Sequence, residues 1–200
     1  MANARRPNIT RAVRAVVDDA SRRVPEFAHV KASRILVVAG EARRASWGTI
    51  RPLGPIDRPS GKPVVRVKGR QMLYVVTLRP RWFRVAALEK RVETILHELF
   101  HISKRFDGTL HSGRRHATLR ADFDSKLGPL VKRYLARMPA ELRQALSTHG
   151  TALARQWLEK PGPSVKRGRP AGRRVYTEKH LFLGPVQMIT RVGKPKPRLN

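Results

Sequence analysis

The chain has 200 residues, with 43 lysines and arginines against 14 aspartates and glutamates, and a formal net charge of +29 at pH 7. This length suits one globular domain or one domain with a tail, and 40% hydrophobic residues can form a core, which argues against wholesale disorder. Cysteine is absent, which excludes disulfides, Cys-ligated zinc and thiol catalysis. So basic a surface attracts polyanions, with nucleic acid the first candidate and an acidic protein or an anionic membrane face the alternatives.

The first residues of the chain are polar and basic, and no apolar signal core follows them. The sequence also has no run of about 18 apolar residues of the kind that spans a bilayer. We therefore expect a cytoplasmic protein, and its charge adds the expectation of association with the nucleoid.

The first half of the chain predicts one helix followed by strands. Asn8 is a suitable N-cap for a helix whose apolar residues form one stripe, and Pro25 ends that helix. The Pro- and Gly-rich segment 53–62 predicts a loop. Short apolar runs predict strands at 34–39, 49–51, 64–68 and 72–78. The last two runs flank Gly69 and are expected to form a hairpin or two neighbouring strands.

The second half begins with the most regular helix pattern, in which apolar residues from 88 to 102 step by four, three, four and three. Residues 117–158 are also expected to be helical, with interruptions at 128–129, at 138–139 and near 150. Residues 161–174 are basic and rich in Pro and Gly, with little to bury. The final apolar stretch is expected to return to the domain as a strand or hairpin. We therefore divide the chain into a domain at 1–158 and a tail at 159–200.

The sequence HELFH occupies residues 97–101 of the regular helix. Positions four apart share a helix face, so the imidazoles of His97 and His101 can approach a single ion. Glu98 follows His97 directly, where its carboxylate can reach a metal-bound water. Zinc lowers the pKa of such a water, and a carboxylate can take its proton as the water attacks a carbonyl. We therefore predict a Zn²⁺ cofactor held by His97 and His101, with Glu98 as the general base.

The alternative interpretation of this motif is a helix whose histidines hydrogen-bond to each other or to the backbone. The neighbours of the motif are uncharged and apolar, which indicates a largely buried helix. Two histidines and a glutamate would be poorly compensated in a core without a metal, so burial favours metal binding.

Catalytic zinc requires a third protein ligand and one position left for water. Asp107 lies ten residues after His97, which is the metzincin spacing, but Lys104 stands where that pattern has glycine. His111 and His116 follow beyond a loop. His116 begins a helical pattern that would fix the direction of its side chain, so we favour it, with His111 and Asp107 as the alternatives.

The order of strand, motif helix, loop and second ligand-bearing helix resembles the phage-type metallopeptidases, which look like compact relatives of the SprT-like zinc proteases. The resemblance covers residues 27–123, and its most specific parts are 97–102, 106–108 and 116–123. SprT-like proteins have a third zinc-binding histidine at the position that His116 occupies here, followed by a small residue that is Ala117. They often add a Cys-rich zinc ribbon, which this chain lacks. The resemblance implies an α+β, zincin-like fold and a zinc-dependent peptidase acting on polypeptides.

In zincins the strand before the active helix usually forms the edge of the substrate cleft. Residues 73–78 would then offer unpaired backbone groups to an extended peptide, as in β-augmentation. The spacing selects no residue to stabilise the developing oxyanion; Tyr134 or an arginine could serve.

A second motif lies in the basic tail. Its Gly-Arg-Pro core looks like an AT-hook, in which Gly168 removes bulk and Pro170 extends the chain so that Arg169 can insert into an A·T-rich minor groove. The predicted nucleic-acid-binding residues are Lys166, Arg167, Gly168, Arg169, Pro170, Arg173 and Arg174. The alternative is a solvated, non-specific basic linker.

Together these features predict a zinc metallopeptidase of the zincin type, with a polypeptide substrate and DNA as a further partner through the tail. The alternative is a nucleic-acid-binding protein whose metal site is structural or degenerate. A third hypothesis, from another class, is a metal-dependent hydrolase of a non-peptide amide.

Overall fold

The computed structural model describes residues 6–40, 46–53, 63–112, 120–162, 165–166, 169–170 and 174–188. Its helices are α1 (Ile9–Arg23), α2 (Pro80–Val85), α3 (Leu88–Phe100), α4 (Arg120–Arg137) and α5 (Ala140–Leu146), with three-residue 3-10 turns η1 (Pro25–Phe27), η2 (Ala32–Arg34) and η3 (Glu178–His180). Its strands are β1 (Ile35–Ala39), β2 (Gly48–Pro52), β3 (Val64–Val67), β4 (Arg70–Met72), β5 (Tyr74–Leu78), β6 (Gly150–Trp157), β7 (Val165–Lys166), β8 (Arg169–Pro170), β9 (Val175–Tyr176) and β10 (Leu181–Met188).

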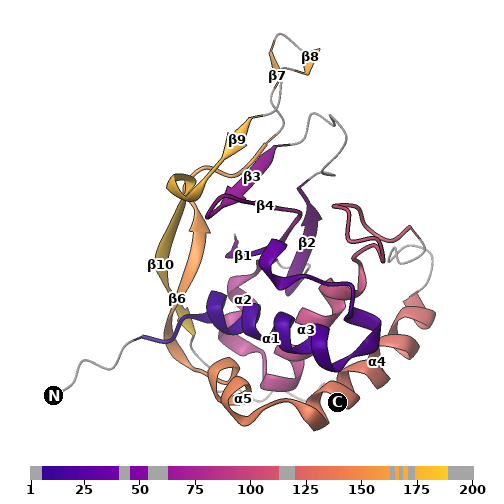
Figure 1. The fold of residues 1–200 in the computed structure, drawn as a ribbon. Helices are drawn as coiled ribbons and strands as arrows, with labels where there is room; N and C mark the ends of the chain where they lie inside the picture. Colours follow the sequence, from indigo (N-terminus) through magenta and orange to yellow (C-terminus); the bar gives the residue numbers. More distant parts are fainter. Residues whose placement is uncertain are drawn as a thin grey trace, which may run out of the picture.

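The larger sheet has the strand order β10-β6-β1-β5-β2. Its three central strands, β6, β1 and β5, are parallel to one another, while the outer strands β10 and β2 are antiparallel to their neighbours. A smaller sheet has the order β4-β3-β9, and the short strands β7 and β8 pair with each other. These mixed sheets together with the helices confirm the predicted α+β class (Figure 1).

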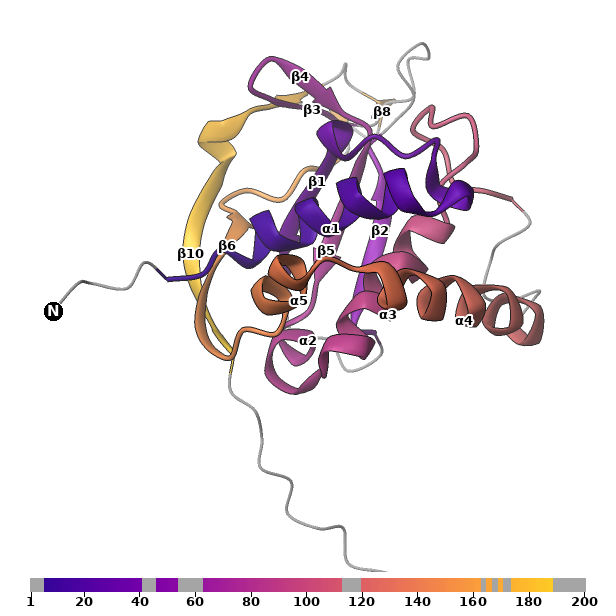
Figure 2. The same ribbon diagram turned by 60° about the horizontal axis from the view of Figure 1, so that its bottom comes forward.

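Two apolar cores lie on opposite faces of the larger sheet. The main core contains residues of all five described α-helices together with the sheet residues Val37, Val76 and Ile50. Figure 2 shows α1 lying across the strands on this face. The second core joins the other face, through Leu36 and Val75, to the smaller sheet. The central strands are therefore covered on both faces, as expected for parallel strands rich in Val and Leu.

Helix α1 follows directly from its sequence. The Asn8 side chain accepts a hydrogen bond from the Arg11 N–H at 2.9 Å, which caps the first turn. The valines of its apolar stripe are fully buried against the sheet. The helix ends at Arg23, with Val24 as its C-cap just before Pro25. Both predicted ends of this helix are confirmed.

Residues 150–157 form strand β6, so the prediction of helical structure up to 158 is wrong. Ala, Leu, Arg and Gln in this segment favour a helix. The backbone pairs instead with β10 along its whole length, from Gly150↔Met188 to Trp157↔Leu181. Ala152 and Ala154 alternate as fully buried residues, and their small side chains let α1 approach the sheet. Pairing between distant segments overrides the local preference.

Helix α4 continues through Gly128 and Pro129, so the interruption predicted there is also wrong. A proline inside a helix costs about 3 kcal/mol or more, because it removes one backbone N–H and crowds the preceding turn. Leu127, Leu130 and Tyr134 are buried in the main core. Burying each such side chain contributes roughly 1.5–3 kcal/mol, which outweighs the cost of the proline. The predicted interruption at 138–139 is confirmed, because α4 ends at Arg137.

The chain around Gly69 forms a hairpin between β3 and β4, with Lys68 and Gly69 at positive φ of 50° and 71°. The expected pairing of 64–68 with 72–78 is wrong, because β5 leaves this hairpin and enters the larger sheet. There β5 is paired on both sides, by β1 and by β2. The prediction that 73–78 forms the open edge is therefore wrong as well, since the edge strands are β10 and β2 and the edge next to β5 is β2.

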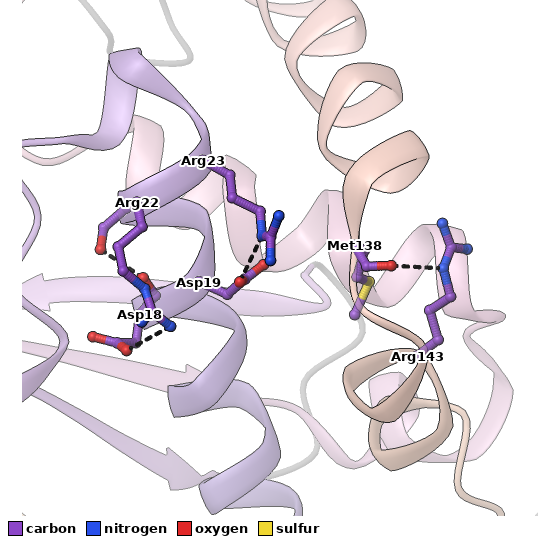
Figure 3. A network of polar contacts seen from close by, with 7 residues as sticks. Asp18, Asp19, Arg22, Arg23, Met138 and Arg143 are labelled. Atoms are coloured by element: carbon purple, nitrogen blue, oxygen red, sulfur yellow. Dashed lines mark hydrogen bonds and ion pairs between the residues drawn. The ribbon is translucent and has the colours of Figure 1, made fainter.

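Polar contacts secure the ends of the helices on the main core (Figure 3). On α1, Asp18 pairs with Arg22 and the buried Asp19 pairs with Arg23, at 3.1 and 2.7 Å. At the junction of α4 and α5, the Arg143 guanidinium donates to the backbone carbonyl of Met138 at 3.2 Å and also to that of Leu135. A cation at the carbonyl end of a helix stabilises both the last turn and the helix dipole.

The segment after residue 158 contributes to both sheets. β10 forms one edge of the larger sheet and β9 pairs with β3. Along the chain between β6 and β9, the backbones of Lys166 and Arg169 pair as the short strands β7 and β8. Arg174 pairs with Glu159 at 2.8 Å and lies over the ring of Tyr176. The separation of the chain at residue 158 stays a prediction. None of the helices in the described ranges is long and apolar enough to cross a membrane.

Candidate metal centre

The two histidines of the motif lie one turn apart at the end of α3. His97 is half-buried in the last turn, and His101 is the buried C-cap residue of the helix. Their Nε2 atoms are 3.3 Å apart. Two nitrogen ligands held about 2.0–2.1 Å from a tetrahedral zinc ion are separated by about 3.3–3.4 Å. The spacing of the two imidazoles therefore fits a shared zinc ion, and it also fits a hydrogen bond between the two rings.

Glu98 lies between the helix and the edge strand β2. Its side chain is only 7% exposed. A Cβ atom on Gly48 would lie 3.6 Å from the Glu98 Oε1 and 3.1 Å from the Cγ2 of Thr94, so a glycine at 48 lets the strand approach α3 closely. The backbone N–H of Ile50 hydrogen-bonds to the Glu98 carboxylate.

Burial raises the pKa of Glu98 to about 7, against the opposing effects of the Ile50 N–H and the positive charge of Arg79. Arg79 is itself buried and follows β5 directly. A carboxyl group with a pKa near neutrality can both accept and release a proton at physiological pH. This is the property expected of a general base.

Strand β2 presents alternate backbone groups to the open edge of the sheet. Trp47 accepts a hydrogen bond from the Arg79 N–H at 2.9 Å, and the Leu53 N–H donates to Leu73 at 2.8 Å. In an antiparallel ladder these positions and every second residue between them bond to the neighbouring strand. The backbone groups of Gly48 and Ile50 therefore point away from β5, on the side where Glu98 lies.

The chain reverses directly after His101 and returns to it. Ile102 and Leu110 form a bridge, and the His111 N–H donates to the His101 carbonyl at 2.8 Å. The hydroxyl of Tyr74 fixes this reversal from β5, since it donates to the Thr109 carbonyl at 2.8 Å and accepts from the Gly108 N–H at 3.0 Å. Burial raises the pKa of Tyr74 to about 12, so this hydroxyl keeps its proton.

The three candidates for the third ligand lie in or beyond this reversal. Asp107 accepts hydrogen bonds from the Thr109 hydroxyl at 2.6 Å and from its N–H at 3.1 Å, and these contacts lower the pKa of Asp107. The backbone of His111 adjoins that of His101. His116 lies outside the described residues. Within the described ranges, no three His, Asp or Glu side chains are close enough to hold a metal together.

Sequence reasoning identified the motif but missed the residues that surround it. Gly48 and Ile50 were expected only as part of a weak strand, and Tyr74 and Arg79 carried no signal of their own. Their roles arise from contacts between β2, β5 and α3, which no local pattern encodes. Tyr134, considered as an oxyanion stabiliser, is fully buried beside Asp19 on α1, so it cannot reach a substrate.

Comparison with known proteins agrees with this site. A family model described as "Putative phage metallopeptidase" matches residues 4–143, which is more than half of the chain. The match includes the motif helix and the strands β1, β2 and β5 around it. No curated protein and no solved structure matches the chain. The expected resemblance to the phage-type metallopeptidases is confirmed, while the likeness to SprT-like proteases stays a prediction; the chain belongs to the phage metallopeptidase family.

Proposed function

We propose that this chain is a zinc-dependent peptidase whose metal is held by His97 and His101. The observation that supports this most strongly is the 3.3 Å separation of their Nε2 atoms, with the Glu98 carboxylate on the same helix. Zinc, when bound, supplies a Lewis acid that polarises a carbonyl and acidifies water. Membership of a metallopeptidase family points to a polypeptide as the substrate.

Glu98 is the base in this proposal. Its carboxylate takes a proton from the attacking water and returns it to the leaving amine, which a pKa near 7 allows in both directions. The Ile50 N–H and Arg79 favour the ionised form that begins the cycle, while burial favours the protonated form that completes it.

The substrate is proposed to bind as an extended strand along β2. The backbone groups of Gly48 and the carbonyl of Ile50 point toward this open edge and can pair with a peptide backbone, while the Ile50 N–H bonds to Glu98. Because Glu98 contacts the same stretch of β2, a peptide bound there lies beside the base. In this proposal β2 pairs with the peptide in place of residues 73–78, for which the sequence had predicted that role.

His116 is proposed as the third ligand. Along the chain it lies between His111, whose backbone bonds to His101, and Arg120, the first residue of α4. Five residues of chain span at most about 18 Å, so the length of chain after His111 allows His116 to reach the motif. His111 and Asp107 are the alternatives, and Asp107 is the weaker of them because Thr109 already occupies its carboxylate.

The zinc site is tested by metal content. The purified protein is expected to hold one zinc ion per chain, and the double variant His97→Ala, His101→Ala is expected to hold none, because one remaining ligand binds zinc weakly. His149→Ala, which changes an exposed histidine at the start of β6, should keep full occupancy. If the wild-type protein holds no zinc after dialysis against a zinc-containing buffer, the histidines hydrogen-bond to each other and the zinc peptidase proposal is wrong.

A second proposal concerns the basic tail, which we infer to contact DNA as an AT-hook-like element and so to place the protein near the nucleoid. The net charge of +29 supports it. Replacing Lys166, Arg167, Arg169 and Arg173 by glutamine is expected to weaken binding to an A·T-rich duplex at least about tenfold and to flatten its salt dependence. Arg174 is left unchanged because it pairs with Glu159. Equal affinity of this variant and the wild-type protein would identify the tail as an ordinary linker.

A further inference from the structure

A cavity lies at the carboxyl ends of the three parallel strands, where Ile50 and Arg79 separate it from Glu98. β1, β5 and β6 run in the same direction and end side by side, at Ala39, Leu78 and Trp157. The next strand of this sheet after β1 is β2, on one side, and the next after β6 is β10, on the other, so the connections diverge between β1 and β6. In open α/β sheets, ligands bind in the crevice that such a divergence creates at the carboxyl ends of strands. The cavity here has a volume of about 800 Å³, within the range of ligand sites.

The cavity opens mainly on the sheet face turned away from α3. Ile50 and Val76 belong to the main core under that helix, and side chains alternate along a strand. Thr49, Arg51 and Thr77 therefore project from the opposite face, and all three line the cavity. The cavity thus opens on the other face of the sheet from α3, which carries His97 and ends at His101.

Its lining combines positive charge with one aromatic ring. Arg51, Arg79 and Lys160 line it, and none of the described residues around it is acidic. Trp157 is half-buried, because it packs against the second core and also lines the cavity. Cations bind phosphate through charge-assisted hydrogen bonds, and an aromatic ring stacks on a nucleobase.

We propose that this cavity binds a nucleotide, with the phosphate held by Arg51, Arg79 and Lys160 and the base against Trp157. Thr49, Thr77 and Gln156 supply hydroxyl and amide groups for the sugar and the base edges. An inorganic anion has no ring to stack on Trp157, and the acidic side chains of a peptide, Asp and Glu, carry no aromatic ring either. A base-paired duplex has no free base face to offer, so the nucleotide is either free or part of a single strand.

The cavity and the metal centre share two residues. Ile50 and Arg79 line the cavity, and both also act on the Glu98 carboxylate. A phosphate bound in the cavity would interact with the same Arg79 charge that favours ionised Glu98. A bound nucleotide would therefore act directly on the carboxylate proposed as the general base. The binding site itself does not depend on the peptidase proposal.

The proposal is tested by equilibrium binding, followed through tryptophan fluorescence, with adenosine monophosphate, a ten-residue single-stranded oligoadenylate, inorganic phosphate and a polyglutamate peptide as probes. Wild-type fluorescence is expected to be quenched by the nucleotide or by the oligonucleotide, and Trp157→Phe is expected to abolish the quenching. Trp82 is fully buried and Trp47 packs against the main core without lining the cavity, so neither should respond. Binding of the mononucleotide identifies a free ligand, and binding of the oligonucleotide alone identifies one unit of a strand; both support the site.

The double variant Arg51→Gln, Lys160→Gln is expected to weaken binding at least about tenfold, since each lost charge-assisted hydrogen bond to phosphate is among the stronger polar contacts. Both side chains are exposed, so the variant should fold. Arg66→Gln, Arg70→Gln removes the same charge from the exposed β3–β4 hairpin and should change affinity less than twofold at 150 mM salt. Equal loss in the two double variants, tighter binding of polyglutamate, or no binding of either nucleotide probe would overturn the proposal. None of these readouts requires peptidase activity or bound zinc.

Discussion

Replacing Glu98 by glutamine is expected to lower the rate of peptide hydrolysis at least about 100-fold while leaving zinc content unchanged. General-base catalysis contributes typically about 10²–10⁴ to a rate, and an amide cannot accept the proton. The two imidazoles that hold the metal are separate side chains, so they should bind zinc as before. The measurement is kcat for a peptide substrate, with zinc content determined on the same preparation.

Glu93→Gln is the matched control for this substitution. Glu93 lies on the same helix, is partly exposed and pairs with Lys90 on the surface, so the change should leave kcat within twofold. Full activity of Glu98→Gln would remove Glu98 from the role of base. Loss of both zinc and activity would show instead that the carboxylate helps to hold the metal. Retained zinc with no peptidase activity in the wild-type protein would favour the degenerate-site alternative.

The same substitution has a second expected effect, on the stability of the metal-free protein. The pKa of Glu98 is raised by burial from 4.5 to about 7, so the folded state binds its proton more tightly than the unfolded chain does. The favourable contribution of Glu98 to the free energy of unfolding is therefore fully present below pH 4.5, and it is lost as the pH rises through about 7. Glu98→Gln should gain stability relative to the wild-type protein between pH 5 and pH 8, as measured by urea unfolding in a chelator.

Replacing Arg91 by methionine is expected to destabilise the protein by about 3 kcal/mol or more. Arg91 lies on α3 and is 1% exposed. Its guanidinium donates to the carbonyls of Leu146 and Thr148 at 2.6 and 2.9 Å and to that of Phe83 at 3.0 Å. These carbonyls belong to the ends of α5 and α2, where a cation also stabilises the helix dipoles. Methionine fills the space but leaves three carbonyls without this donor, and each buried group left unsatisfied costs about 1–3 kcal/mol.

Burial lowers the pKa of Arg91 to about 10, so the residue stays charged at neutral pH. Arg91→Lys should also be destabilising, because one ammonium group cannot reach both helix ends as a planar guanidinium does. Arg84→Met is the control: Arg84 is exposed on α2, so stability should change by no more than about 0.5 kcal/mol. Urea unfolding gives all three values. Equal stability of Arg91→Met and the wild-type protein would show that water or relaxed geometry satisfies these carbonyls.

The local part of the site could be predicted because it depends on helix geometry alone. Residues four apart share a face of any α-helix, so the approach of His97 to His101 follows from their spacing once α3 is identified. The N-cap at Asn8 and the hairpin turn at Gly69 are local in the same way. His116 stays a prediction, as do the zinc ion and the tail residues.

Contacts between distant segments decided the rest. Residues 150–157 have helix-favouring side chains, yet pairing with β10 makes them a strand, because a ladder of backbone hydrogen bonds outweighs small differences in propensity. Which strand forms the open edge depends on the order of pairing in the sheet, and that order brings Gly48 and Ile50 to Glu98. The sequence by itself determined that two histidines and a carboxylate share one helix. Only the tertiary structure decided what buries that carboxylate and which strand forms the sheet edge beside it, because both depend on segments far apart in the chain.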